Sequence, residues 1–259
     1  MFNKKKIKFP IKSLDFGKIL IVDIWLIKNL KKNEKKNLKE FLRQILRILK
    51  LCLFTYPKIK FSKSKKFSIF YIRLHARADL ENHSQHYENI KDTTVCVMQK
   101  REKKFSLFNF LNCIYLCFLS RKQWLKELQD NNIDLLSYHG LEILLKLLKS
   151  LSDAIKIYPL LLKHVKLVSF QEMLPEENII CQLANINNIK TYALEHAVAT
   201  YENEGPAWRR WQKYIYLNPV CKNILCWGEF SKKLREKHTY AKAYTIGKAG
   251  LPKFQKAET

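Results

Sequence analysis

Short stretches rich in aromatic and β-branched residues alternate along the sequence with longer stretches of helical periodicity. The strand-like stretches cover residues 67–74, 93–98, 166–170, 190–194, 223–227 and 243–246. Between them, helical spacing of apolar residues is clearest over residues 107–131, 141–162 and 175–188. Because strands and helices alternate from residue 67 onward, the sequence predicts an α/β fold: a Rossmann-like, mainly parallel sheet flanked by helices, with right-handed crossovers.

The first part of the chain follows a different pattern. Over residues 34–54 the apolar positions form a helical stripe with Lys and Arg opposite, which predicts a helix that ends at Tyr56-Pro57. Residues 58–66 combine Lys with Ser and are expected to form an exposed joint. The chain is thus expected to divide into a basic helical N-terminal extension at 1–64, a Rossmann-like domain at 65–252 and a short tail at 253–259.

The charge of the chain favours an anionic partner. Its 259 residues contain 48 Lys and Arg against 23 Asp and Glu, a formal net charge of +25. Nucleic acid, an anionic membrane face and a phosphorylated substrate all fit this charge. An AT-rich coding sequence would also enrich Lys without a functional cause. With 47% hydrophobic residues the chain has enough apolar material for a core, which excludes wholesale disorder.

Two apolar runs bear on membrane association. Residues 19–27 are interrupted by Asp23, and residues 105–119 are flanked by Lys and Arg. Both runs are shorter than the ~20 residues of a spanning helix, and no small-residue cleavage site follows the first, so no signal peptide is expected. The second run is expected to be either a core helix or a helix lying on an anionic membrane face. Together with the basic lead, it predicts peripheral association with the membrane.

Neither a metal nor another cofactor is expected. The seven cysteines lie mostly inside apolar runs and form no Cys-x-x-Cys pair, which is typical of buried reduced thiols in a cytosolic protein. His83 and His86 have helical i, i+3 spacing, but no carboxylate or thiol partner is placed to complete a metal site.

Polar residues follow several of the predicted strands directly. Glu195 and His196 end one strand, Gln171 and Glu172 follow another, and Gly228 follows a third. Ligands of open α/β sheets bind beyond the carboxyl ends of the strands, so these residues predict the rim of a cleft. His is suited to proton transfer near neutral pH. The alternative is that His196 only caps its strand and bonds to nearby backbone.

Two further groups are candidate substrate contacts. Arg73, His75 and Arg77 alternate with other residues, so in an extended segment they share one face and are suited to holding a phosphate or a sugar acceptor. A solvated strand tip is the alternative. Arg209 lies among Trp residues in the long loop 197–218, a mixture found in sugar- and nucleic-acid-contacting loops and also in packed loops.

The order of features over residues 168–252 resembles that of bacterial surface-polysaccharide glycosyltransferases of the GT-B type, including capsule-biosynthesis and CDP-glycerol phosphotransferase relatives. The shared features are a strand, the helix ENIICQLANINN, a strand ending in a Gln-His-Gly-like motif, a long loop, the segment CWGEFSKKL and the turn YTIGKAGLP. The resemblance implies a nucleotide-sugar donor, a glycan or lipid-linked acceptor, and work at the cytoplasmic face of the bacterial inner membrane. It implies an acid/base or phosphate-contact role for His196, with Glu195 shaping its pKa.

Two departures from this pattern shape the expectation. The Gln-His-Gly-like motif is Glu195-His196-Ala197 here, and Ala does not adopt positive φ as freely as Gly. No Gly-rich phosphate loop occurs, and the chain ends at Thr259, where a donor-binding second domain would begin. The expectation is therefore the acceptor-side N-terminal half, without the donor domain. A non-catalytic remnant or accessory protein is one alternative. A basic nucleic-acid-binding protein is another, resting on charge alone, and is not favoured.

Overall fold

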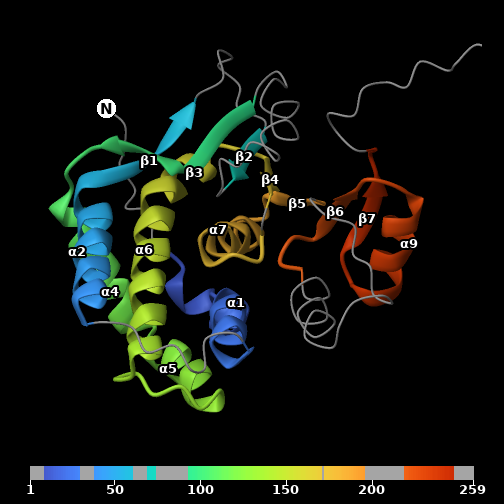
Figure 1. Ribbon diagram of the computed structural model, residues 1–259. Coiled ribbons are helices and arrows are strands. Elements are labelled where there is room, and N and C mark those ends of the chain that lie inside the picture. Colours follow the sequence, from blue (N-terminus) through green and yellow to red (C-terminus); the bar gives the residue numbers. More distant parts are fainter. Residues whose placement is uncertain are drawn as a thin grey trace, which may run out of the picture.

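In the part of the chain that the structure describes, helices pack against a seven-stranded sheet (Figure 1). The computed structural model describes residues 9–29, 38–60, 69–73, 93–170, 172–195 and 219–247. The strands are β1 (Thr55–Lys60), β2 (Ile69–Arg73), β3 (Thr93–Lys103), β4 (Lys166–Ser169), β5 (Lys190–Leu194), β6 (Asn223–Cys226) and β7 (Lys242–Thr245). The helices are η1 (Ile11–Ser13), α1 (Phe16–Asn29), α2 (Leu38–Phe54), α4 (Leu107–Leu119), α5 (Arg121–Asp130), α6 (Tyr138–Leu161), α7 (Pro175–Ile186) and α9 (Glu229–His238).

The sheet is parallel except at one edge, as the alternation of elements predicts. Its strand order is β1-β3-β2-β4-β5-β6-β7, and only the β1–β3 pair is antiparallel. The chain runs from β2 to β3 on one side and then to β4 on the other side of β2. This reversal is the topological switch point of a doubly wound sheet. The α/β, Rossmann-like fold expected from the sequence is confirmed.

Both faces of the sheet are apolar, which is why its strands read as nearly continuous hydrophobic runs. Phe70 and Ile72 of β2 and Leu167 of β4 belong to the main core, together with residues of the helices. The alternating residues Tyr71 and Val168 belong to a second cluster on the opposite face, with Val95, Phe170 and Leu194. Successive side chains of a strand point to opposite faces, so β2, β3, β4 and β5 each contribute to both clusters.

The N-terminal region is built into the main core. Buried residues of α1, among them Phe16, Ile19 and Leu20, share one hydrophobic cluster with the sheet and α6. Gln182 of α7 also bonds to the backbone just before α1. Its side chain accepts a hydrogen bond from the Asp15 N–H at 2.6 Å and donates one to the Asp15 carbonyl at 3.0 Å. A boundary near residue 64 therefore does not separate two hydrophobic cores. The helix predicted over residues 34–54 is present as α2.

β1 replaces part of the joint expected at residues 58–66. Its six residues pair with β3, and the register shifts between Pro57 and Lys58. Pro lacks an N–H for the ladder and is tolerated in an edge strand or at a bulge. Pro57 therefore lies at the irregular point of an edge strand. In the sequence it was interpreted as the end of a helix, so the strand was not predicted.

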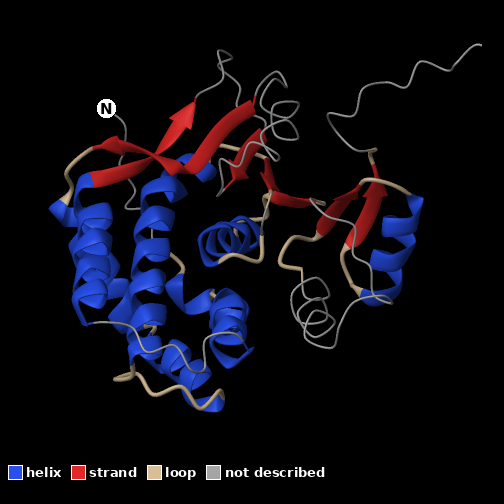
Figure 2. Cartoon of the chain, in the orientation of Figure 1, coloured by secondary structure: helices blue, strands red, loops and turns tan. Residues whose placement is uncertain are grey.

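Two of the predicted helical regions also differ from expectation. The region 107–131 is two helices, α4 and α5, which meet at Ser120; its buried hydroxyl donates to the Leu116 carbonyl at 3.0 Å. Conversely, α6 continues through Pro159, a residue type that usually ends or kinks a helix. Figure 2 shows α6 as one long helix beside α2. Since α6 contacts α1, α2, α4 and α7, tertiary packing compensates for the hydrogen bond that Pro159 removes.

The first turn of α6 requires a glycine. Ser137 caps the helix, its hydroxyl accepting a hydrogen bond from the Gly140 N–H at 3.1 Å. A Cβ at Gly140 would lie 2.2 Å from the Asp134 carbonyl oxygen and 2.7 Å from the Leu135 Cα. These are backbone atoms of the preceding loop, so the clash is relieved only by moving the loop away from the helix.

Gly140→Ala is expected to lower the free energy of unfolding by about 2 kcal/mol, the cost of overpacking a closed site. This is opposite to the usual stabilising effect of replacing Gly by Ala within a helix. Gly228→Ala is the matched control, since a Cβ there meets nothing within 4 Å. Urea denaturation of both variants measures the difference, and equal stability of the two would contradict the predicted clash.

Candidate functional site

The carboxyl ends of the parallel strands lie along one edge of the sheet, as expected. Ile72 pairs with Ser169, and Ser169 pairs with Ala193. Leu194 pairs with Leu225 on the next strand. The register therefore places the backbone of Arg73 level with the positions at which β4 and β5 end. Arg73 closes β2, the strand at which the chain reverses direction across the sheet, and such a switch point is where α/β sheets bind ligands.

Glu195 lies at this edge, but its carboxylate is directed into the structure. The residue is buried, and its Oε2 accepts a hydrogen bond from the Trp227 N–H at 2.8 Å, while its own N–H donates to the Leu225 carbonyl at 3.0 Å. Burial raises the pKa of Glu195, whereas the Trp227 N–H and the charge of Arg235 act to lower it. Glu195 thus joins the end of β5 to the end of β6 and the start of α9.

Glu172 also contributes to the connection into β6. Its Oε2 accepts hydrogen bonds from the backbone N–H groups of Val220, at 3.0 Å, and Cys221, the two residues that precede this strand by a short turn. Desolvation raises the pKa of Glu172, and the Cys221 N–H and Arg235 oppose that rise. In the structure, Glu172 therefore satisfies backbone donors that lead into β6.

Arg235 is a part of this region that the sequence did not single out. It is buried on α9, and its positive charge lowers the pKa of both Glu172 and Glu195. Arg235 follows Ser231 by four residues, so in a helix the two share one face, and both are buried. This spacing is the only feature of the sequence that relates Arg235 to the buried face. In the basic segment SKKLREKH, an Arg is easily interpreted as one more solvated cation.

Carboxylates also occupy the start of α7, where a phosphate-binding domain of this kind would hold an anion. The Glu177 carboxylate accepts hydrogen bonds from the Ser169 hydroxyl and, at 3.0 Å, from the Phe170 N–H. Glu176 lies in the same first turn and pairs with Lys149 at 2.7 Å. The positive end of the α7 macrodipole is therefore already next to acidic side chains, which disfavours a phosphate there.

Gly228 begins α9 at the same edge of the sheet. It is the N-cap residue, with an extended backbone and no side-chain cap, and its carbonyl accepts the Lys232 N–H at 3.0 Å. The backbone here needs no special conformational freedom. Apart from its chain neighbours, no atom lies within 4 Å of the point that a Cβ would occupy, so the position has room for a side chain.

The remaining predicted site residues are not placed by the structure. His196, His75, Arg77, Gln171 and Arg209 lie outside the described residues. Arg73 is described only through its backbone. Of the predicted set, the structure thus places Glu195 and Gly228 near one another at the ends of β5 and β6, one strand removed from β2, and directs Glu172 toward the start of β6.

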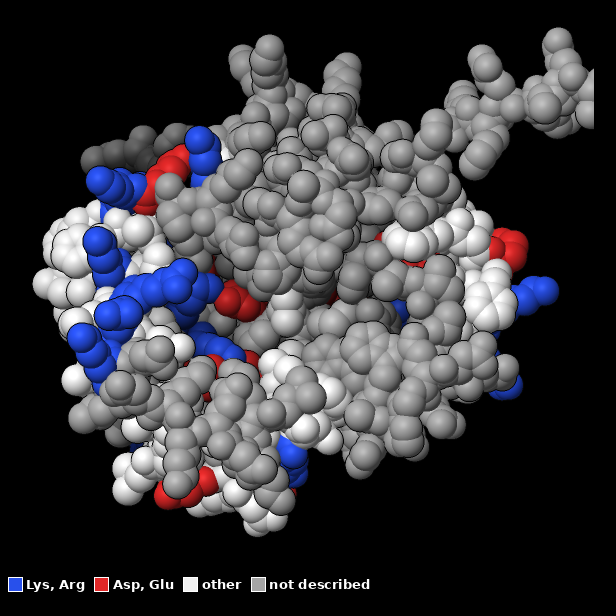
Figure 3. Space-filling view, in the orientation of Figure 1, with Lys and Arg blue, Asp and Glu red and all other residues white. Residues whose placement is uncertain are grey.

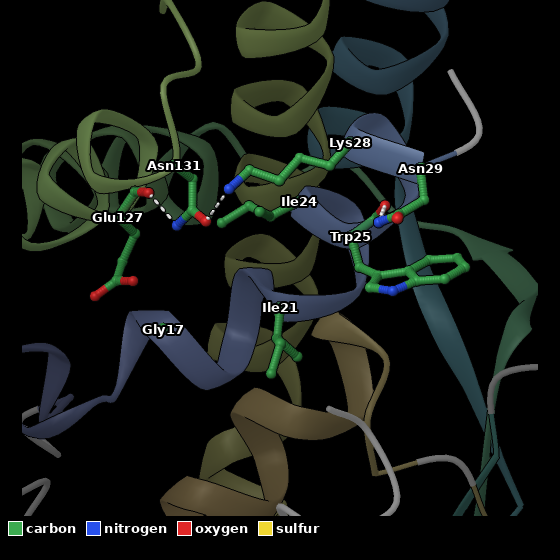
Figure 4. A pocket seen from close by; sticks show the side chains of 8 residues that line it. All are labelled: Gly17, Ile21, Ile24, Trp25, Lys28, Asn29, Glu127 and Asn131. Carbon is green, nitrogen blue, oxygen red and sulfur yellow. Dashed lines mark hydrogen bonds between the residues drawn. The ribbon is translucent and has the colours of Figure 1, made fainter. Parts of the chain in front are cut away.

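The larger of the described cavities lie away from this edge. One of about 480 Å³ is found between α1 and α5, and a neighbouring one of about 590 Å³ shares Lys28 and Asn131 with it. In Figure 4, Lys28 and Asn131 point toward one another, and their hydrogen bond measures 2.8 Å. Asn131 in turn donates to the Glu127 carbonyl at 2.8 Å. Because these polar groups bond to one another, the cavity presents few converging donors or acceptors to a ligand.

The described residues include neither a metal-binding cluster nor a membrane-spanning helix. No group of three or more His, Cys, Asp or Glu side chains in that part of the chain is arranged to hold a metal ion. Among the same residues, no helix has both the length and the apolar character that crossing a bilayer requires.

Comparisons with protein-family models, with curated proteins and with solved structures give no match for this chain. The resemblance to GT-B glycosyltransferases therefore stays a prediction drawn from the residues that carry it.

Replacing Arg235 tests the electrostatic arrangement at the strand ends. Arg235→Met is expected to lower the free energy of unfolding by about 3 kcal/mol, because it leaves two desolvated carboxylates without their cation. Lys233→Met, an exposed position on the same helix, is the control and is expected to change stability by less than about 0.5 kcal/mol. Equal losses in denaturant unfolding would show that Arg235 contributes no more than a surface charge.

The raised pKa of Glu195 predicts a pH dependence with a definite sign. The folded protein binds this proton more tightly than the unfolded chain, whose pKa is near 4.5. The stability contribution is therefore present at and below pH 4.5 and is lost as the pH rises through the folded pKa. Relative to Glu195→Gln, wild-type stability should fall between pH 4.5 and 7. A difference that is constant or rises over this interval would refute the raised pKa.

Proposed function

We propose that this chain is the acceptor-side Rossmann-like domain of a glycosyltransferase of bacterial capsule or lipopolysaccharide-type surface glycans. The observation that supports it most directly is the edge formed by the ends of β2, β4, β5 and β6. Arg73, Glu195 and Gly228, which the resemblance and the strand-end pattern single out, lie along this edge at the ends of β2, β5 and β6, with β4 between Arg73 and Glu195. In an open parallel sheet this edge is where ligands bind.

The character of the edge favours a neutral, hydroxyl-rich ligand. Glu177 and Glu195 are buried carboxylates beside the strand ends, and the exposed Glu229 begins α9. Negative charge at these positions disfavours a phosphate beside them, and the exposed Glu229 carboxylate is available to accept hydrogen bonds from sugar hydroxyls. The proposal therefore assigns a glycan or lipid-linked acceptor to this chain and the phosphate-rich nucleotide-sugar donor to another part of the enzyme.

Within this proposal, His196 is the acid/base or phosphate-contact residue, and Arg73, with His75 and Arg77, contacts the acceptor. The protein works in the cytoplasm, peripherally at the inner face of the cell membrane, where lipid-linked acceptors are found. Its net charge of +25 and its lack of a described membrane-crossing helix are compatible with that location.

Hydrogen exchange with a lipid-linked monosaccharide in detergent micelles tests the assignment. Protection is expected at the ends of β2, β4, β5 and β6, and empty micelles provide the background. His196→Ala is expected to weaken binding about tenfold, a loss of ~1.4 kcal/mol. His238→Ala, at an exposed position on α9, should bind like the wild type.

Two results would contradict the proposal. Protection confined to the cavity between α1 and α5 would place the ligand elsewhere. Nucleotide release from any of UDP-, GDP-, CMP- or dTDP-sugars by the chain alone, dependent on the acceptor, would show that the donor site lies in this chain. A transferase gains about 7–11 kcal/mol from holding both substrates in attack geometry, so the acceptor half alone is expected to give no measurable turnover.

A further inference from the structure

The solvent face of α4 consists entirely of large apolar side chains. The helix LFNFLNCIYLCFL contains no charged residue, and its Leu107, Phe108, Leu111, Ile114, Tyr115, Phe118 and Leu119 are exposed. These positions recur at intervals of three and four residues and so form a stripe along the helix. Phe108 exposes 78% of its surface. A helix of a globular protein ordinarily shows polar residues on this side.

The opposite face of α4 is already used for packing. Cys113, Leu116 and Cys117 are buried in the main core, and the Cys113 thiol donates to the Leu148 carbonyl of α6 at 3.1 Å. Ser106 caps the helix by accepting from the Asn109 N–H at 3.3 Å. The helix is therefore firmly held, and its apolar stripe is a fixed feature of the surface.

The stripe continues onto α2. The rings of Phe54, at the end of α2, and Phe105, just before α4, lie 5.4 Å apart, and both are exposed. Leu42 and Leu46, the latter 68% exposed, extend the apolar surface along α2. The exposed apolar area that α4 forms with Phe105 and Phe54 marks an interaction site rather than the scattered hydrophobic residues of an ordinary surface.

Cations surround this apolar surface. Lys103 and Lys104 precede α4, and Arg121 and Lys122 follow it, all exposed. The Arg121 guanidinium lies over the Phe118 ring at 4.0 Å, so charge and apolar surface meet directly. On α2, Lys39, Arg43, Arg47 and Lys50 are exposed as well. Figure 3 shows Lys and Arg gathered over the part of the molecule where α2 and α6 lie.

We propose that this surface, the α4 stripe with Leu42, Leu46 and Phe54, docks the protein onto an anionic lipid bilayer. The apolar side chains enter the boundary between headgroups and acyl chains, and the flanking cations pair with anionic headgroups. The 13 residues of α4 span only ~20 Å against the ~30 Å of the hydrocarbon core, so the helix lies in the plane of the membrane. This surface gives a physical basis to the membrane location proposed above, and it requires no transferase reaction.

The charge around α4 favours a bilayer over a second copy of the chain as the partner of this surface. In a two-fold dimer the same patch faces itself. Such a dimer through α4 would bring two sets of Lys103, Lys104, Arg121 and Lys122 together. The exposed Glu102 is the one described carboxylate adjacent to them in the sequence, so the cations would stay in excess. An anionic membrane satisfies both the apolar stripe and its cationic border.

Sedimentation with vesicles tests the docking surface. Wild-type protein is expected to bind vesicles of phosphatidylglycerol and phosphatidylcholine at least about tenfold more strongly than phosphatidylcholine alone. Phe108→Ser/Phe118→Ser is expected to lose about tenfold or more in affinity for the anionic vesicles. The control, Leu136→Ser/Phe230→Ser, removes equally exposed apolar side chains elsewhere, 81% and 67% exposed, and should bind like the wild type.

A second variant keeps the test valid if the first unfolds, as judged by circular dichroism. Arg121→Gln/Lys122→Gln leaves the apolar stripe unchanged and should lose most of the preference for anionic lipid. The proposal is overturned if wild type binds neither kind of vesicle, or if both variants bind like the control. It is also overturned if the wild type is a dimer that ignores vesicles and that Phe108→Ser/Phe118→Ser converts to a monomer.

Discussion

Two lysines of α6 hold the helical layer together through carboxylates that are largely cut off from water. The Lys146 ammonium lies 2.7 Å from Asp23 of α1 and 3.3 Å from Glu142, and Lys149 lies 2.7 Å from Glu176 of α7. Burial raises the pKa of Asp23 even though Lys146 opposes the rise. Desolvation thus outweighs the attraction of the pair for this carboxylate, so these contacts fix geometry more than they add net stability. Because α7 follows β4 directly, the position of α6 also determines where the sheet lies.

Desolvated carboxylates also fix the geometry of the strand ends. Glu172, Glu177 and Glu195 accept backbone hydrogen bonds at or near the ends of β4, β5 and β6, and Arg235 compensates two of them. A buried carboxylate that orders backbone leaves the adjacent edge well defined. The carboxylate that follows an apolar strand therefore has a structural role. A ligand that binds beyond the strand ends would contact backbone whose geometry is already fixed.

The general fold was predictable because it depends on patterns that repeat. Strand and helix alternation fixed the parallel sheet, and the signals around Pro175 located α7 at its observed start. Single residues misled where tertiary packing overrode local preference. Pro57 concealed an edge strand, and Asp23 interrupted an apolar run that is a core helix with its charge paired by Lys146. For the site, the strand-end positions were predictable, whereas the buried role of Arg235 was not, since sequence does not reveal which cation of a basic helix is desolvated.

The irregular pairing at Pro57 affects how the edge of the sheet can associate with other chains. Within the described sheet, β1 is an outer strand, and its free side is a template to which another chain could add. Pro57 removes a donor from the strand, the register shift bends it, and Lys58 adds an exposed charge. These are the features by which natural sheets prevent edge-to-edge association. A chain with an exposed apolar helix is thereby protected against growing into fibrous aggregates through this edge of its sheet.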